Sequence, residues 1–492
     1  MKRLFTLFTL LLTLTLPPVC AQTLSLDSCR ALALRNNKAI GMAREQMEKA
    51  YYDRKAARTN YLPKVALTAG YVRTGDEISL LSDGQKGALS SMGTGMAGEF
   101  GQLAGQILQQ HPELAPLLQQ ASGYVGQVAG ALNGVGQGIV DALRTDTRNM
   151  TAGAIILTQP LYMGGKIRAY DRITRLAQQA ADEKMRAGRQ EVLLETDRAY
   201  WQVVSLANKR KLAVAYRDML RRLDEDVLRM IREGVATKAN ELSVSVKLNE
   251  AEMTLAKVED GLTLSRMLLC QLCGLPLDTP VETADEQLPE LADGAAYGTA
   301  ANADRAFQSR PELALLQAAL DIQKEKVNIE RAAFLPQLAL MGGYMTTNPG
   351  LTNGFENRFR GTWAVGVTLK VPVWNWGEGK YKVRAAKAEA NIASLQRDEV
   401  REKIELQVRQ AAFRINEADR KLALSIRNKE KAEENLRTAQ LGFREGVIVT
   451  SDLLMAQTAW LQAQSDKIDA QIDVRLSRSM YEKALGTLDK GD

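Results

Sequence analysis

The residue types that most often carry out chemistry in proteins are scarce in this sequence. His111 is the only histidine among 492 residues, which excludes histidine-based catalytic triads and metal sites with several histidines. The sequence also contains no nucleophile elbow, no phosphate-binding loop and no pair of carboxylates in a pocket-like setting. We therefore predict that the protein is not an enzyme and that it uses no cofactor or metal ion.

The charge balance gives no sign of a nucleic-acid partner. Lysine and arginine number 64 against 58 aspartates and glutamates, a formal net charge of +6. This surplus is too mild for a dedicated nucleic-acid binder. The hydrophobic share of 45% and the charged share of 25% are those of an ordered chain.

Residues 1–21 have the pattern of a secretory signal peptide. A basic start, Met1-Lys2-Arg3, precedes the apolar run 4–16, and Val19-Cys20-Ala21 supplies a cleavage site. Cys20 leaves lipoprotein processing as an alternative, although Pro18 and Val19 are poor residues ahead of a lipidated cysteine. No later run of 18 or more apolar residues follows, so we expect either a soluble exported protein or a membrane β-barrel.

The rest of the sequence reads as an internal duplication. Leu62-Pro63 and Leu335-Pro336 are offset by 273 residues, but Pro160 and Pro372 by only 212, as are two Arg-Glu-Gly-Val segments. The smaller offset indicates an insertion of 61 residues in the first repeat. The predicted parts are a first repeat at 22–274 with the insertion at 75–148, a linker at 275–310 and a second repeat at 311–492.

Each repeat contains two predicted strands beside its prolines. Apolar side chains alternate with small or polar ones, as in Trp363, Val365 and Val367 against Ala364 and Gly366. At about ten residues, such strands are long enough to cross a bilayer when tilted. The predicted strands are 64–74, 150–160, 337–347 and 361–371.

Aromatic residues stand next to the ends of these strands at corresponding positions of the two repeats. They resemble the aromatic girdle of a membrane barrel, although ordinary core aromatics are the alternative for any one of them. The predicted membrane-interface aromatics are Tyr61, Tyr162, Phe334, Trp374 and Trp376.

The proline-free stretches predict very long helices. Apolar residues from Ile404 to Leu422 recur at alternating steps of four and three, a heptad pattern. One helix from Lys166 to Ile231 would be roughly 100 Å long, too long for a compact domain. We predict antiparallel helical pairs at 165–274 and 378–486, and shorter helices at 26–60 and 311–333.

Four strands cannot close a barrel, since about eight are needed, and an open sheet in lipid would leave backbone groups unpaired. The strands must therefore close with copies from other chains. Three copies would give twelve strands, although two or four copies are not excluded by this argument.

The ordered set of features resembles the TolC-like outer-membrane efflux proteins over residues 24–488, apart from the insertion. The resemblance rests on Leu62-Pro63, Leu335-Pro336, Pro160, Pro372 and the closing Tyr481-x-x-Ala-Leu-Gly486, together with the two glycine turns. It implies a mainly α-helical homotrimer whose twelve-stranded β-barrel in outer-membrane lipid continues into a periplasmic α-helical barrel. It also implies an exit duct of a tripartite efflux or type I secretion system, docked to a periplasmic adaptor and an inner-membrane transporter.

The resemblance assigns roles to the two helical turns. The adaptor-docking tip would comprise Arg232, Glu233, Gly234, Val235, Phe443, Arg444, Glu445, Gly446 and Val447. The periplasmic gate would comprise Asp452, its repeat counterpart Asn240, Met455 in place of an acidic residue and Ile448 in place of an arginine. The alternative is that Asp452 only caps the returning helix.

Three further interpretations remain. Cys270 and Cys273 have redox spacing, but their repeat counterparts, Glu482 and Leu485, indicate packing, and Cys29 has no obvious mate. The glycine-rich insertion, with apolar positions from 103 to 118 and from 124 to 143 that suggest two helices, is either a folded cap outside the cell or a disordered loop. The alternative function is an exported structural coiled-coil or envelope spacer without channel activity.

Overall fold

The computed structural model describes residues 22–75, 77, 80–144, 146–287, 301–350 and 357–489. The predicted signal peptide and Cys20 lie outside these residues, as does part of the predicted linker. The chain forms two compact units. We call them the helical unit (1–57, 169–328 and 380–492) and the sheet unit (58–168 and 329–379), and we describe each by itself.

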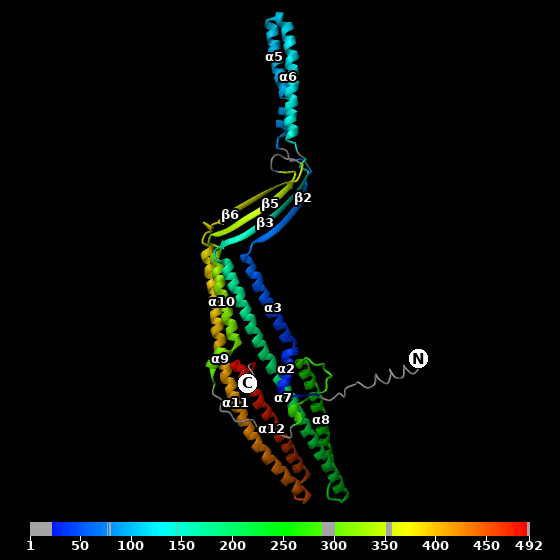
Figure 1. The fold of residues 1–492 in the computed structure, drawn as a ribbon. Helices are drawn as coiled ribbons and strands as arrows, with labels where there is room; N and C mark the ends of the chain where they lie inside the picture. Colours follow the sequence, from blue (N-terminus) through cyan, green and yellow to red (C-terminus); the bar gives the residue numbers. More distant parts are fainter. Residues whose placement is uncertain are drawn as a thin grey trace, which may run out of the picture. The chain divides into compact units, whose positions relative to one another are not determined.

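Long helices make up most of the helical unit (Figure 1). Helices α7 and α11 have 67 residues each, and α8 and α12 have 36 each. The helices are α2 (Leu26–Asn36), α3 (Lys38–Arg58), α7 (Lys166–Arg232), α8 (Lys238–Cys273), α9 (Ala303–Ser309), α10 (Pro311–Ala332), α11 (Glu378–Arg444) and α12 (Thr450–Leu485). Strands β1 (Gln22–Leu24) and β4 (Val281–Thr283) form a parallel pair, so the predicted linker contributes a strand and α9.

The prediction of a single helix over 26–60 is wrong in one respect, because the helix is interrupted at Asn37. The backbone of Asn37 is extended, and its side-chain oxygen accepts from the amide of Ala39 at 2.8 Å. Short polar side chains of this kind compete with helical hydrogen bonding. The amide nitrogens of Asn36 and Asn37 also donate to the carbonyls of Cys273 and Leu272, so the break satisfies the last turn of α8.

The burial of the described cysteines agrees with their predicted packing role, and Cys29, for which the sequence offered no obvious mate, is a free cysteine. Cys29, Cys270 and Cys273 are all buried in one core cluster with Tyr200 and Val203. The Sγ of Cys273 lies 3.7 Å from the carbonyl oxygen of Cys29. Hydrogen bonding from Cys273 and burial raise the pKa of the Cys29 thiol, so it stays protonated at neutral pH.

A partly buried ion pair joins α2 to α7. Arg30 donates from Nε to Asp197 Oδ1 at 2.7 Å and from Nη2 to Oδ2 at 2.6 Å. The Asp197 side chain has no exposed surface, and its hydrogen bonds raise the pKa of the Arg30 guanidinium. This two-pronged geometry is the strongest form of a carboxylate pair.

Four antiparallel strands form the main sheet of the sheet unit, in the order β2, β3, β5, β6 (Figure 1). They are β2 (Lys64–Arg73), β3 (Asn149–Met163), β5 (Gln337–Asn348) and β6 (Arg360–Lys370). Of the four, β3 differs most from its expected bounds, 150–160, because it continues to Met163. A register shift at Pro160 accompanies this extension, as expected for a residue that has no amide hydrogen to donate.

The insertion between β2 and β3 is helical. It contains α4 (Asp83–Ser90), α5 (Met92–Gln110) and α6 (Ala115–Ala142), which pack on one another. The continuous helix suggested over 103–118 is wrong, because α5 ends at Gln110 and a short 3₁₀ turn follows. Pro112 explains the break, since proline disfavours helix in the residue before it and cannot donate to the preceding turn.

Within the described part of the chain, none of the helices is both long enough and apolar enough to span a membrane.

The partly buried pair generates a prediction about stability. Asp197→Ala removes both hydrogen bonds from the Arg30 guanidinium, and losing hydrogen bonds to a charged group costs about 1.5–3 kcal/mol. Urea unfolding followed by circular dichroism should show this loss. The control is Asp27→Ala, because Asp27 is 3.9 Å from the same arginine but almost fully exposed. It should change stability by less than about 1 kcal/mol, and equal losses in the two variants would contradict the assignment.

Candidate functional site

The main sheet has one strongly apolar face. Directly paired residues of neighbouring strands share a face, and Leu67 pairs with Ile155, Ile155 with Tyr344, and Tyr344 with Trp363. The same face carries Val65, Tyr71, Leu157, Leu338, Leu340, Val365, Val367 and Leu369. Leu67 is 75% exposed and Trp363 74%, so this face is available to an apolar surrounding.

The opposite face of the sheet is built from small or uncharged side chains. Pairings along one row join Thr68 to Ala154, Ala154 to Met345, and Met345 to Thr362. The next rows add Ala66, Ile156, Gly343, Ala364, Thr158, Met341 and Gly366. A strand with an apolar face and a small, polar-tolerant face is typical of barrels that separate lipid from an aqueous interior.

Charged residues occur only at the ends of the two outer strands. Strand β2 begins at Lys64 and ends at Arg73, and β6 begins at Arg360 and ends at Lys370. In the described part of the chain, each outer strand is hydrogen-bonded on one side only, β2 to β3 and β6 to β5. Long basic side chains at strand ends can reach the polar edge of a membrane, which marks an uncharged band between them.

Four of the five predicted interface aromatics are exposed, and one is packed. Trp374 and Trp376 are 76% and 85% exposed and stack edge to face, with ring centroids 5.6 Å apart. Tyr61 and Tyr162 are also exposed. Phe334 is half-buried, and a Cβ on Gly379 would lie 2.7 Å from its ring, so Phe334 packs against the start of α11.

The two helical turns share one backbone motif. At the first turn, Val235 N donates to Met230 O and Gly234 N to Ile231 O, at 2.9 and 3.0 Å. At the second turn the same bonds run from Val447 to Gly442 and from Gly446 to Phe443, at 2.8 and 3.1 Å. This is the Schellman motif, whose left-handed residue favours glycine. Gly234 has φ +77° and Gly446 has φ +72°.

The predicted docking tip is exposed except for Phe443. Arg232, Glu233, Val235, Arg444, Glu445 and Val447 are all exposed, with the two valines at 69% and 81%. Phe443 is buried in a cluster that joins α7 and α8 to α11 and α12. Phe443 therefore lies on the face of α11 that packs against the other helical pair, and its assignment to the docking tip stays a prediction.

The tips of the two helical pairs are joined by a hydrogen bond as well as by this cluster. Asn240 Nδ2 donates to Thr450 Oγ1 at 3.0 Å, and Asn240 is also part of the capping box of α8 with Thr237. Asn240, predicted as a gate residue, thus links the first turn of α8 to the first turn of α12. Ile448 is half-buried against the same cluster and over Gly442.

Asp452 and Met455 are the predicted gate residues with exposed side chains. The structure does not support the alternative that Asp452 caps α12, because Val449 occupies the N-cap and makes no side-chain cap bond. The Asp452 carboxylate instead accepts from Ser451 Oγ at 3.4 Å. In the first turn of α12 it is also favoured by the helix dipole.

Reasoning from the sequence missed a groove near the tip, between α7, α11 and α12. It has a volume of about 660 Å³, and its walls combine Met219, Leu223 and Phe443 with charged residues. The charged lining residues are Asp218, Arg222, Asp226 and Arg444. No sequence signal identified it, because the groove depends on how two helical pairs distant in sequence pack together.

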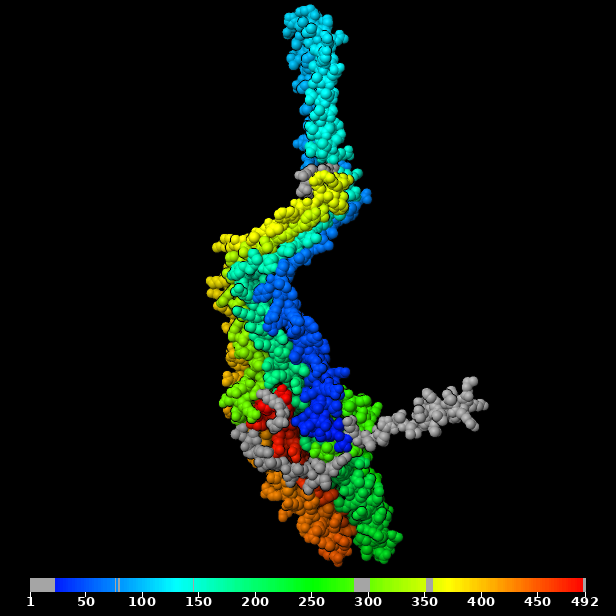
Figure 2. All heavy atoms as spheres, viewed as in Figure 1, coloured from blue at the N-terminus to red at the C-terminus, as the bar shows by residue number. Residues whose placement is uncertain are grey.

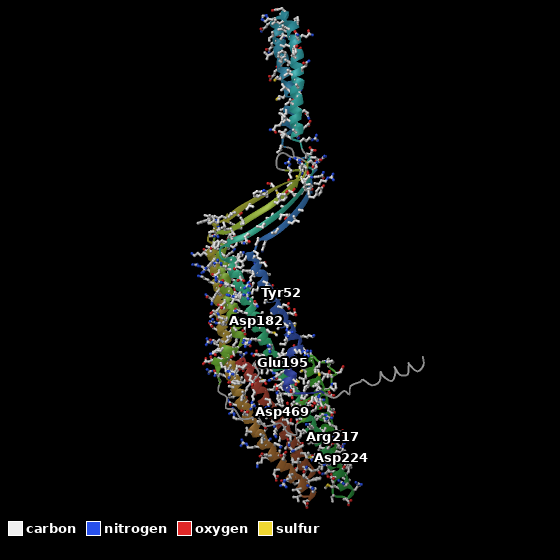
Figure 3. All side chains as sticks on the ribbon, viewed as in Figure 1. Tyr52, Asp182, Glu195, Arg217, Asp224 and Asp469 are labelled. Atoms are coloured by element: carbon white, nitrogen blue, oxygen red, sulfur yellow. The ribbon has the colours of Figure 1, made fainter. Side chains whose placement is uncertain are left out.

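Another acidic residue of α7, Asp224, lies close in sequence to the groove residues Asp218 and Asp226. Burial and the neighbouring Glu241 of α8 raise the pKa of Asp224, which is labelled with Arg217 in Figure 3. A raised pKa means that the surroundings of this carboxyl group disfavour its negatively charged form. Among the described residues, no cluster of histidine, cysteine, aspartate or glutamate side chains could hold a metal ion.

A family model described as "Outer membrane efflux protein" matches residues 120–275 and 302–487. The chain belongs to this family. It is an outer-membrane exit duct of the kind used in efflux or type I secretion, with its helical tunnel in the periplasm. The relatives give no support to a structural spacer without channel activity.

Relatives support the same family, and a solved structure has the same fold. The chain is 28% identical over 345 residues to the alkaline protease secretion protein AprF of Pseudomonas aeruginosa, covering 68% of this chain and 69% of AprF. It is 22% identical over 350 residues to the outer membrane protein TolC of Vibrio cholerae, covering 70% and 78%. Its fold matches the Campylobacter jejuni CmeC channel with a TM-score of 0.72 at 16% identity, covering 94% and 86%.

The two faces of the sheet can be distinguished by a pair of neighbouring substitutions. Leu67→Arg places a charge on the apolar face in mid-strand, which costs about 2–4 kcal/mol near the middle of a bilayer. We expect a marked loss of assembled, heat-modifiable protein in outer-membrane fractions. Thr68→Arg, on the opposite face, should assemble nearly as well as the parent protein. Equal assembly of the two variants would contradict the assignment of the faces.

Proposed function

We propose that this protein acts as a homotrimer in which three four-stranded sheets close into one twelve-stranded barrel. The unpaired outer edges of β2 and β6 support this proposal, because an edge in lipid has no water to bond. The observation that carries it is the combination of these edges with the exposed apolar face. Twelve strands would enclose an aqueous interior lined by the face that contains Thr68 and Thr362.

We further propose that the helical pairs of three copies form the periplasmic tunnel and that the chain arose by internal duplication. The equal lengths of α7 and α11, and of α8 and α12, support the duplication. So do the matching C-caps of α8 and α12, where Gly274 and Gly486 have φ +70° and +73°. Each repeat would then supply one hairpin to the barrel and one helical pair to the tunnel.

The proposed partners at the periplasmic end are an adaptor protein and, through it, an inner-membrane transporter. The exposed turns around Gly234 and Gly446 and the neighbouring groove offer apolar and charged groups together, as interfaces commonly do. Because one relative is named for protease secretion and another for efflux, the class of duct fits either cargo. In such systems, the transporter would select the substrate.

The proposed gate is a ring of three Asp452 carboxylates, one from each copy. Its support is the exposure of Asp452 at the start of α12, with Met455 one turn later. Converging carboxylates at a constriction favour cations over anions. Asn240 and Ile448 would hold the two tips in position from within the packed cluster.

Conductance in planar bilayers tests the duct and its gate together. The purified trimer should conduct ions with cation preference, and Asp452→Asn should lower the ratio of cation to anion permeability, because it removes the ring of charge. Asp452→Glu retains the charge and should retain the preference. A monomeric protein without conductance would overturn the proposed function, whereas conductance that is unchanged in Asp452→Asn would overturn only the gate.

Adaptor docking can be tested at the second turn. A Cβ added to Gly446 would meet no other atom within 4 Å, so a side chain there acts mainly through the left-handed backbone. Gly446→Val should strain the turn by about 1–3 kcal/mol and reduce adaptor recovered with the trimer after cross-linking in cells. Gly446→Asn, which tolerates this conformation, is the matched control. Full adaptor recovery with Gly446→Val would contradict the docking role.

A further inference from the structure

The helical insertion exposes regularly spaced apolar side chains. Along α6 they recur at alternating steps of seven and four residues, and along α5 at steps of four, seven and four. Both are parts of an eleven-residue repeat, which keeps these side chains on one stripe of each helix. We call these positions the seam residues; they are between 38% and 69% exposed. They are Met92, Met96, Leu103 and Ile107 on α5, and Leu117, Tyr124, Val128, Val135 and Ile139 on α6.

The seam residues are not the ones that hold α5 and α6 together in a helical hairpin. Helices α5 and α6 lie side by side (Figure 2) and meet through small residues, since a Cβ on Gly93 would lie 2.1 Å from the carbonyl oxygen of Ala129. Asn133 reinforces this contact, because its Oδ1 accepts from the amide of Gly93 at 2.8 Å and its Nδ2 donates to Thr94. Each helix therefore has an internal contact face and, separately, a seam.

The two seams emerge on the same side of the hairpin. At 3.6 residues per turn, the seam precedes the contact face by about a quarter of a turn in both helices, as the adjacent positions Met92 and Gly93 illustrate. In both helices, the seam is rotated from the contact face by a similar angle in the same direction along the sequence. Because α5 and α6 are antiparallel and face each other, both seams therefore lie on one side of the pair. The hairpin thus presents a continuous apolar surface formed by two helices.

This surface lacks the charges that usually keep an exposed helix in water. Between Lys86 and Asp141 the only acidic residues are Glu99 and Glu113, and there is no lysine or arginine. A solvated amphipathic helix normally carries charged side chains on its outer face. The near absence of charge also means that identical surfaces brought together would not repel one another.

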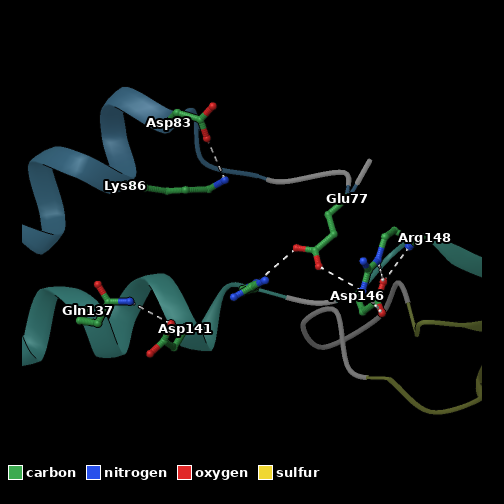
Figure 4. A network of polar contacts seen from close by, with 8 residues as sticks. Glu77, Asp83, Lys86, Gln137, Asp141, Asp146 and Arg148 are labelled. Carbon is green, nitrogen blue, oxygen red and sulfur yellow. Dashed lines mark hydrogen bonds and ion pairs between the residues drawn. The ribbon is translucent and has the colours of Figure 1, made fainter. Parts of the chain in front are cut away.

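The hairpin is anchored by charge at its base rather than along its length (Figure 4). Arg144 donates to Glu77 at 3.2 Å, and Arg148 forms two bonds of 2.9 Å with Asp146, which lower the pKa of Asp146 to about 2. The strand ladder continues into this base through the amide of Thr74 and the carbonyl of Arg148. The paired strands β2 and β3 therefore hold the insertion at one end of the sheet.

We propose that the insertions of neighbouring copies pack on one another through their seams and form a helical bundle at the mouth of the barrel. This inference rests on the proposed trimer. The trimer would place three identical hairpins at the same end of one barrel, where their effective concentration for one another is high. An eleven-residue apolar repeat keeps one stripe along the whole helix, as in helices that supercoil around one another. A lipid surface requires only an apolar side, so this regular stripe favours a second copy as the occupant.

Distances between copies test the proposal in the full-length trimer. A spin label is attached to Val135→Cys on the seam, or to Gln137→Cys, which is two residues further and about 200° around the helix. Both positions are exposed, and the described native cysteines are buried. Pulsed dipolar spectroscopy should give a narrow distance distribution for position 135 that is shorter than the one for position 137, with unlabelled parent protein as the background.

Other results would distinguish a failure of the proposed bundle from a failure of the proposed trimer. A distribution at position 135 that is broad, or no shorter than at position 137, overturns the bundle while leaving the trimer intact. A sample that is monomeric by native mass spectrometry overturns the proposed function and the bundle with it. If lipid vesicles alone immobilise the label at position 135, the seam faces a membrane rather than another copy, and the proposal is also overturned.

Discussion

The need to pair every backbone amide and carbonyl in lipid is the constraint on which this structure depends. Among the described residues, the main sheet has four strands, and β2 and β6 each have a partner strand on one side. An unsatisfied backbone group costs several kcal/mol in hydrocarbon, which is why we propose that other copies close the membrane form. The exposed apolar face, the basic strand ends and the aromatic residues near those ends are consistent with this constraint.

The surroundings of each element also explain why the strands and the long helices differ in charge. The strands avoid charge between Lys64 and Arg73 and between Arg360 and Lys370, where the surrounding is apolar. The helices carry mixed charges and place their apolar residues in clusters between the pairs, such as the one that contains Leu220, Val244 and Phe443. A water-filled tunnel tolerates charged helix surfaces. One chain can therefore combine strands suited to lipid with helices suited to water.

Much of this could be predicted from the sequence, because the decisive signals are local or repeated. Alternation around Trp363 and the paired prolines located the strands, and positive φ at Gly234 and Gly446 follows from the repeated turn segment. Contacts between distant segments were not predictable in this way. The burial of Phe443, the contact of Cys273 with Cys29 and the Asn240–Thr450 bond all depend on packing between elements far apart in sequence. The break before Pro112 did have a local signal, but the apolar spacing concealed it.

The most direct test of the central claim is to see what lies beside the outer edge of β2. An electron cryomicroscopy reconstruction of the full-length protein in lipid nanodiscs would identify the neighbouring strand. We predict β6 of an adjacent copy, in a closed barrel of about twelve strands made by three chains. A β2 edge left without a partner strand, or a barrel closed by a different number of chains, would contradict the account.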